Sequence, residues 1–134
     1  EDWYFMIGVM NQNVGYLRPV SSVSTGLASN AVDNNFGTAA TIIDGSSVTV
    51  DLGSSKTITR FNIAELQPGK IRAYRIQALT SRNGYQTVFT GSTVAPDVSI
   101  GRQLSTPVSA RYIRLVIDDV TSSTGLLEFW PRTD

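Results

Sequence analysis

Ser47–Gly53 (SVTVDLG) and Ala110–Ile117 (ARYIRLVI) are the two stretches of this sequence that decide its fold class. In both, apolar side chains alternate with mostly polar ones. Alternation with a period of two puts the apolar side chains on one face of a β-strand and the polar ones on the other. Both stretches therefore predict strands with one buried face. The apolar positions are Val48, Val50 and Leu52 in the first stretch and Ile113, Leu115 and Ile117 in the second.

Short apolar runs of this kind recur along the chain with turn residues between them, a pattern typical of an antiparallel sandwich. The chain is rich in Ser, Thr, Val and Ile, which favours strands and turns, and no segment keeps a helical period of 3.6 residues. We therefore predict an all-β fold, a single antiparallel β-sandwich of about eight strands. The predicted strands are Tyr16–Ser22, Ser47–Leu52, Ile58–Leu66, Arg72–Thr80, Gln86–Thr90, Gln103–Val108, Arg111–Ile117 and Leu126–Trp130.

Three turns between these strands have a chemical signature. Asp44-Gly45 and Asn83-Gly84 supply a residue that adopts positive φ at little cost. Gln67-Pro68-Gly69 reads as a turn with Pro at its second position. These turns predict where neighbouring strands reverse direction.

The overall composition limits the functional classes open to the chain. Its 134 residues fit one domain. It contains no cysteine and no histidine, which excludes disulfides, thiolate metal sites and the commonest general base. Eleven basic residues balance eleven acidic ones, so the net charge indicates neither a nucleic-acid partner nor an anionic membrane surface. No apolar run approaches the roughly 20 residues that span a bilayer.

The two opening stretches carry a family resemblance when they are taken with two flanking motifs. Ala31–Asn35 (AVDNN) precedes them and Leu127–Phe129 (LEF) follows them. Together these motifs resemble the discoidin, or coagulation factor 5/8 type C, domain over roughly residues 13–131. Within that superfamily the chain looks most like the galactose-binding-like carbohydrate-binding modules (family 32 type) of extracellular glycosidases. The resemblance implies a jelly-roll sandwich that binds a ligand without catalysis.

A polar loop, Ser29–Thr38, is the strongest local signal for a metal site. It offers a carboxylate, carbonyls and a hydroxyl, the oxygen ligands that calcium prefers. In the modules that the chain resembles, such a loop and a Glu near the C-terminus hold a structural calcium. The family motif reads Asp-Gly-Asn, and here Asn34 replaces the Gly; Asn tolerates the left-handed conformation. The resemblance implies the ligands Asn30, Asp33, Asn35, Thr38, Leu127 and Glu128.

The same resemblance implies a sugar site in loops at one end of the sandwich. The corresponding segments are Ser22–Ala28, Glu65–Arg75 and Thr121–Leu126. Arg72 matches best an Arg that hydrogen-bonds sugar hydroxyls in such modules, and its alternative role is a salt bridge at the strand edge. Phe36 is either a sugar platform or an anchor for its loop. The predicted ligand-binding residues are Glu65, Lys70, Arg72, Phe36, Ser123 and Leu126.

These observations predict a non-catalytic carbohydrate-binding module or lectin with a structural calcium. The expected partner is a glycan, with galactose-type and fucose-type sugars as the candidates, together with other domains of a larger extracellular enzyme. An enzyme is not expected, because glycoside hydrolysis needs two facing carboxylates and no Ser-His-Asp or Cys-His set exists here. Tyr112, Arg114 and Trp130 lie on predicted strands, where packing explains them.

Two alternatives stay open at this point. A discoidin-type domain that binds a protein, or less readily a lipid, is the rival function. The candidate loops consist mainly of Ser, Thr and Gly with few apolar tips, which disfavours membrane insertion. Residues 1–12 form a dense apolar extension before the domain proper, residues 13–134. That extension is either an extra edge strand or an interface with another domain or copy.

Overall fold

The computed structural model describes residues 13–81, 84–92 and 101–133. This part of the chain folds into antiparallel strands and one short 3₁₀ helix, which confirms the predicted all-β class. No helix within the described ranges is long and apolar enough to span a membrane. Residues 1–12, predicted as an extension, lie outside the described residues. The elements are β1 (Val20–Val23), η1 (Ala28–Val32), β2 (Ala40–Ile42), β3 (Ser47–Glu65), β4 (Ile71–Ser81), β5 (Gly84–Gly91), β6 (Arg102–Val120) and β7 (Thr124–Arg132).

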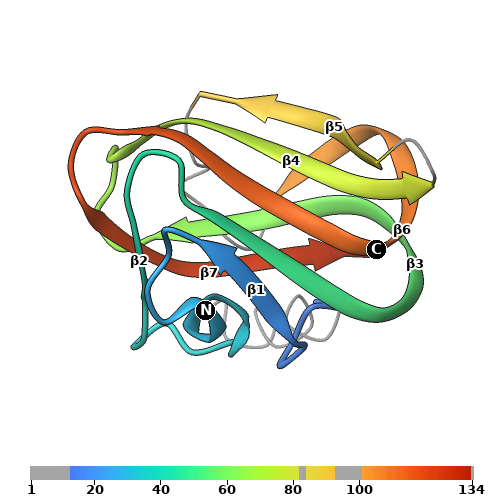
Figure 1. Ribbon diagram of the computed structural model, residues 1–134, viewed down its shortest axis with the longest axis horizontal. Coiled ribbons are helices and arrows are strands. Elements are labelled where there is room, and N and C mark those ends of the chain that lie inside the picture. The colour runs from blue at the N-terminus through green and yellow to red at the C-terminus, as the bar shows by residue number, and fades with distance from the viewer. Residues whose placement is uncertain (1–12, 82–83, 93–100, 134) are drawn as a thin grey trace, which may run out of the picture.

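The two longest strands, β3 and β6, belong to both layers of the sandwich. Each is 19 residues long, and the two pair with each other along most of that length. The first half of β3 also pairs with β1, and its second half pairs with β7. The second half of β6 pairs with β4, which in turn pairs with β5. Figure 1 shows β3 and β6 curving together around one end of the molecule.

The curve in β3 lies at a register shift between Asp51 and Lys56. Gly53 sits within it at φ +86°, a conformation that residues with a Cβ seldom adopt. Leu52 and Ile58, on either side, are buried in the core. Pairing with β6 resumes directly after the curve, so the four strands predicted in these two regions are two continuous ones.

Two other strand predictions differ from the structure. β2 was not expected, because three residues are too few to show an alternating pattern. Tyr16–Ser22 was expected to be a strand, but pairing with β3 begins only at Val20. Leu17, within the predicted strand, has φ +53°, which is incompatible with an extended strand.

The core between the layers contains the apolar side chains that alternate with polar ones in the sequence. All six apolar positions of the two opening stretches are at most 1% exposed. Phe61, Tyr74 and Phe89 add an aromatic cluster, with the rings of Phe61 and Phe89 4.8 Å apart. Edge-to-face packing of this kind favours aromatic pairs beyond the area that they bury.

At Gly125, in β7, the β3–β4 loop and the segment just before β2 both lie close to the strand backbone. A Cβ at this position would lie 2.9 Å from Cβ of Leu66 and 3.1 Å from Cβ of Ala39. Leu66 N–H also donates to the carbonyl of Gly125 at 2.9 Å. Only glycine therefore lets the β3–β4 loop rest against β7.

Gly125→Ala is expected to lower the free energy of unfolding by about 1–3 kcal/mol, because the new methyl group overpacks a contact with two side chains close to their backbones. Gly26→Ala is the matched control, since its Cβ would meet nothing nearer than 3.5 Å. Urea unfolding of both variants measures the difference. Equal stability of the two variants would contradict the assigned close contact.

Candidate functional site

Four loops gather at the end of the sandwich opposite the curve of β3. Val120 N–H donates to Oδ1 of Asp44 at 2.7 Å, and Thr121 N–H donates to the carbonyl of Lys70 at 2.9 Å. Oγ of Ser46 donates to the carbonyl of Ser24 at 2.6 Å. The contacts link the loops after β1, β2, β3 and β6. The three segments predicted to form the ligand end are therefore brought together.

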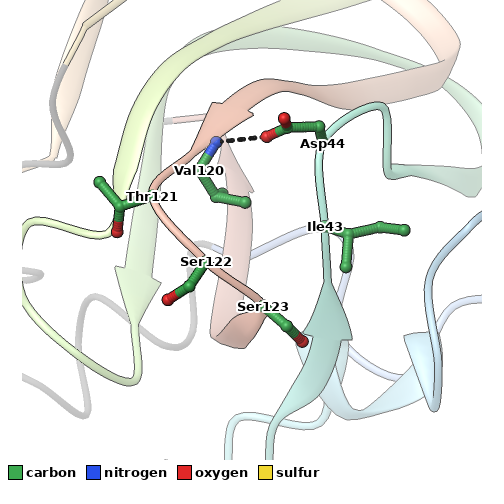
Figure 2. A pocket seen from close by; sticks show the side chains of 6 residues that line it. All are labelled: Ile43, Asp44, Val120, Thr121, Ser122 and Ser123. Atoms are coloured by element: carbon green, nitrogen blue, oxygen red, sulfur yellow. Dashed lines mark hydrogen bonds between the residues drawn. The ribbon is translucent and has the colours of Figure 1, made fainter.

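A hollow of about 280 Å³ lies among these loops. Figure 2 shows its two walls: the β2–β3 loop carries Asp44, and the β6–β7 turn faces it. The walls present a carboxylate, three hydroxyls and apolar surface, a mixture that suits a hydroxyl-rich molecule. The lining residues are Ile43, Asp44, Val120, Thr121, Ser122 and Ser123.

Lys70 stands beside the β6–β7 turn. Its Nζ donates to Oγ of Ser122 at 3.2 Å, so the ammonium group adjoins one wall of the hollow. Arg72, at the start of β4, is exposed, and its guanidinium makes no hydrogen bond or ion pair with another described residue. The salt bridge considered for Arg72 is thus not formed within the part of the chain that the structure describes.

Glu65 has a structural role in place of the predicted ligand contact. Its Oε2 accepts the N–H of Gly69 at 3.0 Å, and its Oε1 accepts those of Lys70 and Ile71 at 3.1 and 3.0 Å. Both carboxylate oxygens are therefore engaged in folding the β3–β4 loop. We correct the prediction accordingly: Glu65 positions Lys70 and does not face the hollow.

Leu126 and Phe36 also differ from the predicted ligand set. Leu126 is 0% exposed and belongs to the core, so no ligand can touch it and its prediction is wrong. Phe36 is half-buried, with its ring centroid 5.6 Å from that of Trp130. This contact is the loop-anchoring alternative considered for Phe36. Ser123, in contrast, lines the hollow, and its contact with a ligand stays a prediction.

The loops at this end expose more apolar surface than their composition indicates. Large apolar side chains stand in solvent at Val23, Leu27, Ile43 and Leu66, with Leu27 71% exposed. Leu27 also has φ +54°, an uncommon conformation for a residue with a bulky side chain. The expectation of few apolar tips is therefore wrong, and the argument that it supplied against membrane insertion no longer holds.

The predicted calcium loop packs against the middle of β7. Glu128 is 1% exposed, and its Oε1 and Oε2 accept the N–H groups of Asn34 and Asn35 at 3.1 and 3.2 Å. Trp130 Nε1–H also donates to Oε1, at 2.8 Å. Asn34 has φ +54°, so the Asn that replaces the family Gly adopts the left-handed conformation, as predicted.

Asp33 lies beside Glu128, and the two carboxyl groups influence each other. Burial, together with a hydrogen bond to Asp33, raises the pKa of Glu128 to about 9. Burial acts in the same direction on Asp33, but hydrogen bonds with Glu128, Thr38 and Asn35 outweigh it and hold the pKa of Asp33 below its usual value. Without a cation, the two carboxyl groups therefore hold one proton between them at neutral pH, and it resides on Glu128.

The remaining predicted metal ligands are close to this pair but engaged with one another. Oγ1 of Thr38 donates to Oδ2 of Asp33 at 2.5 Å and contacts the carbonyl of Asn35 at 3.1 Å. Nδ2 of Asn30 donates to the carbonyl of Ala39 at 3.0 Å, and Leu127 is half-buried on β7. No cluster of three His, Cys, Asp or Glu side chains occurs within the described ranges. The donor set consists of two carboxylates and carbonyl oxygens, which fits calcium in chemical type.

Three residues of the hollow, Ile43, Asp44 and Val120, were missed in the sequence. Asp44 was assigned only to a turn, and Ile43 was assigned to nothing. The missed signal was the position of Ile43-Asp44-Gly45 directly before a strong strand, since ligand-binding side chains are often placed on such loops.

The comparisons with known proteins agree with this architecture. The family model for the F5/8 type C domain matches residues 19–129. The chain is similar to chitosan-binding module 2 of a chitosanase/glucanase from Paenibacillus sp. IK-5, solved with chitotriose. The two are 21% identical with a TM-score of 0.72, over 87% of this chain and 97% of that one.

Two further solved structures share the sandwich. The family 32 carbohydrate-binding module of NanJ from C. perfringens, in complex with galactose, is 22% identical with a TM-score of 0.66, over 83% of this chain and 90% of that one. A fucolectin from striped bass (Morone saxatilis) serum is 19% identical with a TM-score of 0.73. The match covers 91% of this chain and 48% of the fucolectin chain. No curated protein sequence matches the chain significantly. At these identities the likeness shows the β-sandwich fold.

The stability of the protein in excess chelator is expected to fall as the pH rises from about 4.5 to about 9. The pKa of Glu128 is raised from 4.5 to about 9 in the folded state, so the folded protein retains a proton that the unfolded chain releases in this range. The stabilisation is complete below pH 4.5 and is lost through pH 9. Glu128→Gln should flatten this dependence. Urea unfolding at several pH values measures it, and identical slopes for wild type and variant would contradict the shared proton.

Proposed function

The chain belongs to the F5/8 type C domain family, and on this premise we propose that it is a non-catalytic carbohydrate-binding module. Its ligand site is the hollow between the β2–β3 loop and the β6–β7 turn. The observation that carries the proposal is the gathering of Asp44, Thr121, Ser122 and Ser123 around one hollow with Lys70 beside it. Such a set offers both donors and acceptors to sugar hydroxyls.

The architecture of the site supports recognition by hydrogen bonding more than by stacking. None of the described residues that line the hollow is aromatic, and its apolar surface comes from Ile43 and Val120. Hydroxyl contacts largely replace contacts with water, so each adds little net free energy. We therefore expect weak binding, with Kd between micromolar and millimolar, or about 4–8 kcal/mol.

Three relatives in fold support a sugar ligand without specifying it. The similar structures are a chitosan-binding module, a family 32 module in complex with galactose and a fucolectin. They share the sandwich and differ in ligand, which supports the proposal that the loops determine specificity. A glycan of galactose or fucose type remains one candidate within this range. The proposal extends to an extracellular setting and to attachment to a larger glycan-active enzyme.

A structural calcium is the second part of the proposal. The ion would be held by the carboxylates of Asp33 and Glu128, with oxygens of Asn30, Asn35, Thr38 and Leu127. It would replace the proton that the two carboxyl groups otherwise share, and it would relieve the cost of burying Glu128 as an anion. Because Glu128 lies on β7 and Asp33 on the loop after η1, the ion would fasten the two together.

A second function, docking to a protein or lipid surface, is favoured by one observation. Apolar side chains are exposed at Val23, the last residue of β1, and at Leu27, Ile43 and Leu66 on the loops at this end of the sandwich. Exposed apolar loop tips contribute to protein and membrane interfaces. The glycan experiment below separates this function from sugar binding.

Screening the domain on a glycan array and titrating the selected glycan against labelled protein tests the proposed site. We expect amide shifts by NMR at Asp44 and Val120–Ser123. Ser123→Ala should weaken binding about 2- to 10-fold, the effect of one neutral hydrogen bond. Arg72→Ala tests whether the exposed guanidinium at the start of β4 also contacts the glycan. Ser54→Ala, at the curve of β3, is the matched control. If no glycan shifts these amides at millimolar concentration but lipid vesicles or a protein partner do, docking replaces sugar binding.

Calcium at 100 times its Kd is expected to add about 2.7 kcal/mol to the free energy of unfolding. Thermal melting with calcium and with chelator measures the gain. Asp33→Asn and Glu128→Gln should each abolish it, and Asp51→Asn, a carboxylate paired with Arg111 at the other end, should retain it. Melting curves that do not change with calcium, together with a purified protein free of metal, would refute the metal site.

A further inference from the structure

We propose that the hollow selects uncharged sugars because Asp44 and Lys70 balance each other across it. The inference rests on the proposed function and deepens it by naming the charge class of the ligand. Removing either charge would leave the other unopposed and would convert the site to one that favours a charged sugar.

Asp44 fixes a negative charge on one wall. Its Oδ1 accepts the Val120 N–H at 2.7 Å, which holds the carboxylate in place between the two walls (Figure 2). The side chain makes no ion pair with any other described residue. Its second oxygen makes no hydrogen bond within the described part of the chain. The carboxylate therefore acts on whatever enters the hollow.

Lys70 fixes a positive charge behind the opposite wall. Three contacts place it: Glu65 accepts its N–H at 3.1 Å, its carbonyl accepts the Thr121 N–H at 2.9 Å, and its Nζ donates to Ser122 at 3.2 Å. It too makes no ion pair with a described carboxylate. The β6–β7 turn thus stands between an anion and a cation that do not neutralise each other directly.

The surrounding surface repeats this balance. Asp119, near the end of β6, pairs in register with Ala73 of β4, and Arg72 precedes Ala73. Asp119 and Arg72 are both exposed and without an ion pair among the described residues. One further anion and one further cation therefore lie on the neighbouring ends of β6 and β4, and the four charges sum to zero.

Separated charges of opposite sign favour a ligand that donates on one side and accepts on the other, as sugar hydroxyls do. A sugar ammonium gains attraction from Asp44 and repulsion from Lys70, and a sugar carboxylate meets the reverse. Neither gains enough to offset the partial loss of its hydration. The neutral sugar loses less hydration and keeps its hydrogen bonds.

The test uses two matched series at pH 6 and low ionic strength: galactose, galactosamine and galacturonate, and glucose, glucosamine and glucuronate. NMR titration gives each Kd. Wild type should bind the neutral parent at least as tightly as its charged analogues. Lys70→Met, which keeps an apolar stem, should favour the amino sugar over the parent by about 2- to 5-fold. Asp44→Asn, which keeps an acceptor for Val120, should favour the uronate by a similar factor. Both estimates follow from exposed charge pairs.

Lys56→Met and Asp51→Asn, near the curve of β3 at the other end, are the matched controls and should leave the order of the sugars unchanged. A wild-type protein that prefers a charged analogue, or variants that alter all three sugars equally, would overturn the charge balance and leave the proposed function standing. If no sugar of either series shifts an amide of the hollow, the proposed sugar site fails and the inference fails with it. A preference of Lys70→Met for the amino sugar, or of Asp44→Asn for the uronate, that persists at 1 M salt would also overturn it, because screening shortens the reach of the charges to about 3 Å.

Discussion

The antiparallel pairing of β3 with β6 is the interaction on which the rest of this structure depends. Both strands pass from one layer of the sandwich to the other, and each remaining strand is placed by one of them or by a strand that they hold. The two strands curve together at one end, where Gly53 supplies the positive φ. Because backbone pairing is kept on both sides of the curve, the chain changes layer with little loss of hydrogen bonds.

The curve at one end leaves the loops of β2–β3, β3–β4 and β6–β7 together at the other. Their positions are fixed by backbone contacts to buried strands, as in the Gly45 N–H that donates to Ile117 at 2.8 Å. Both carboxylate oxygens of Glu65 accept backbone hydrogen bonds that fold the β3–β4 loop. The polar side chains of the hollow therefore project from a preorganised frame, which reduces the entropy that a ligand must overcome.

The buried carboxyl group of Glu128 imposes a second constraint, where the loop after η1 packs against β7. Glu128 accepts hydrogen bonds from two loop amides and from Trp130, yet it lies beside a second carboxyl group, Asp33. Two adjacent carboxylates cannot both ionise cheaply in a buried place. In this structure the raised pKa of Glu128 and the lowered pKa of Asp33 resolve the conflict by leaving one proton on the pair.

Local alternation and turn chemistry were sufficient to predict the most regular strands and the turns that contain glycine. Val48, Val50 and Leu52 are buried as their spacing predicted, and Gly45 and Gly69 adopt positive φ in the predicted turns. These features depend on residues a few positions apart, so local chemistry is sufficient to predict them. The family resemblance further brought Asp33 and Glu128 together correctly, although 94 residues separate them.

Only the tertiary structure decided which polar side chains are available to a ligand. Glu65 and Arg72 belong to the same predicted loop, but folding engages the first in three hydrogen bonds and leaves the second exposed. Leu126 was predicted to contact the ligand and is in the core, whereas Asp44 was predicted only as a turn and lines the hollow. The role of such a side chain depends on which distant segment packs beside it, and that is set by the pairing of β3, β6 and β7 and not by its neighbours in the chain.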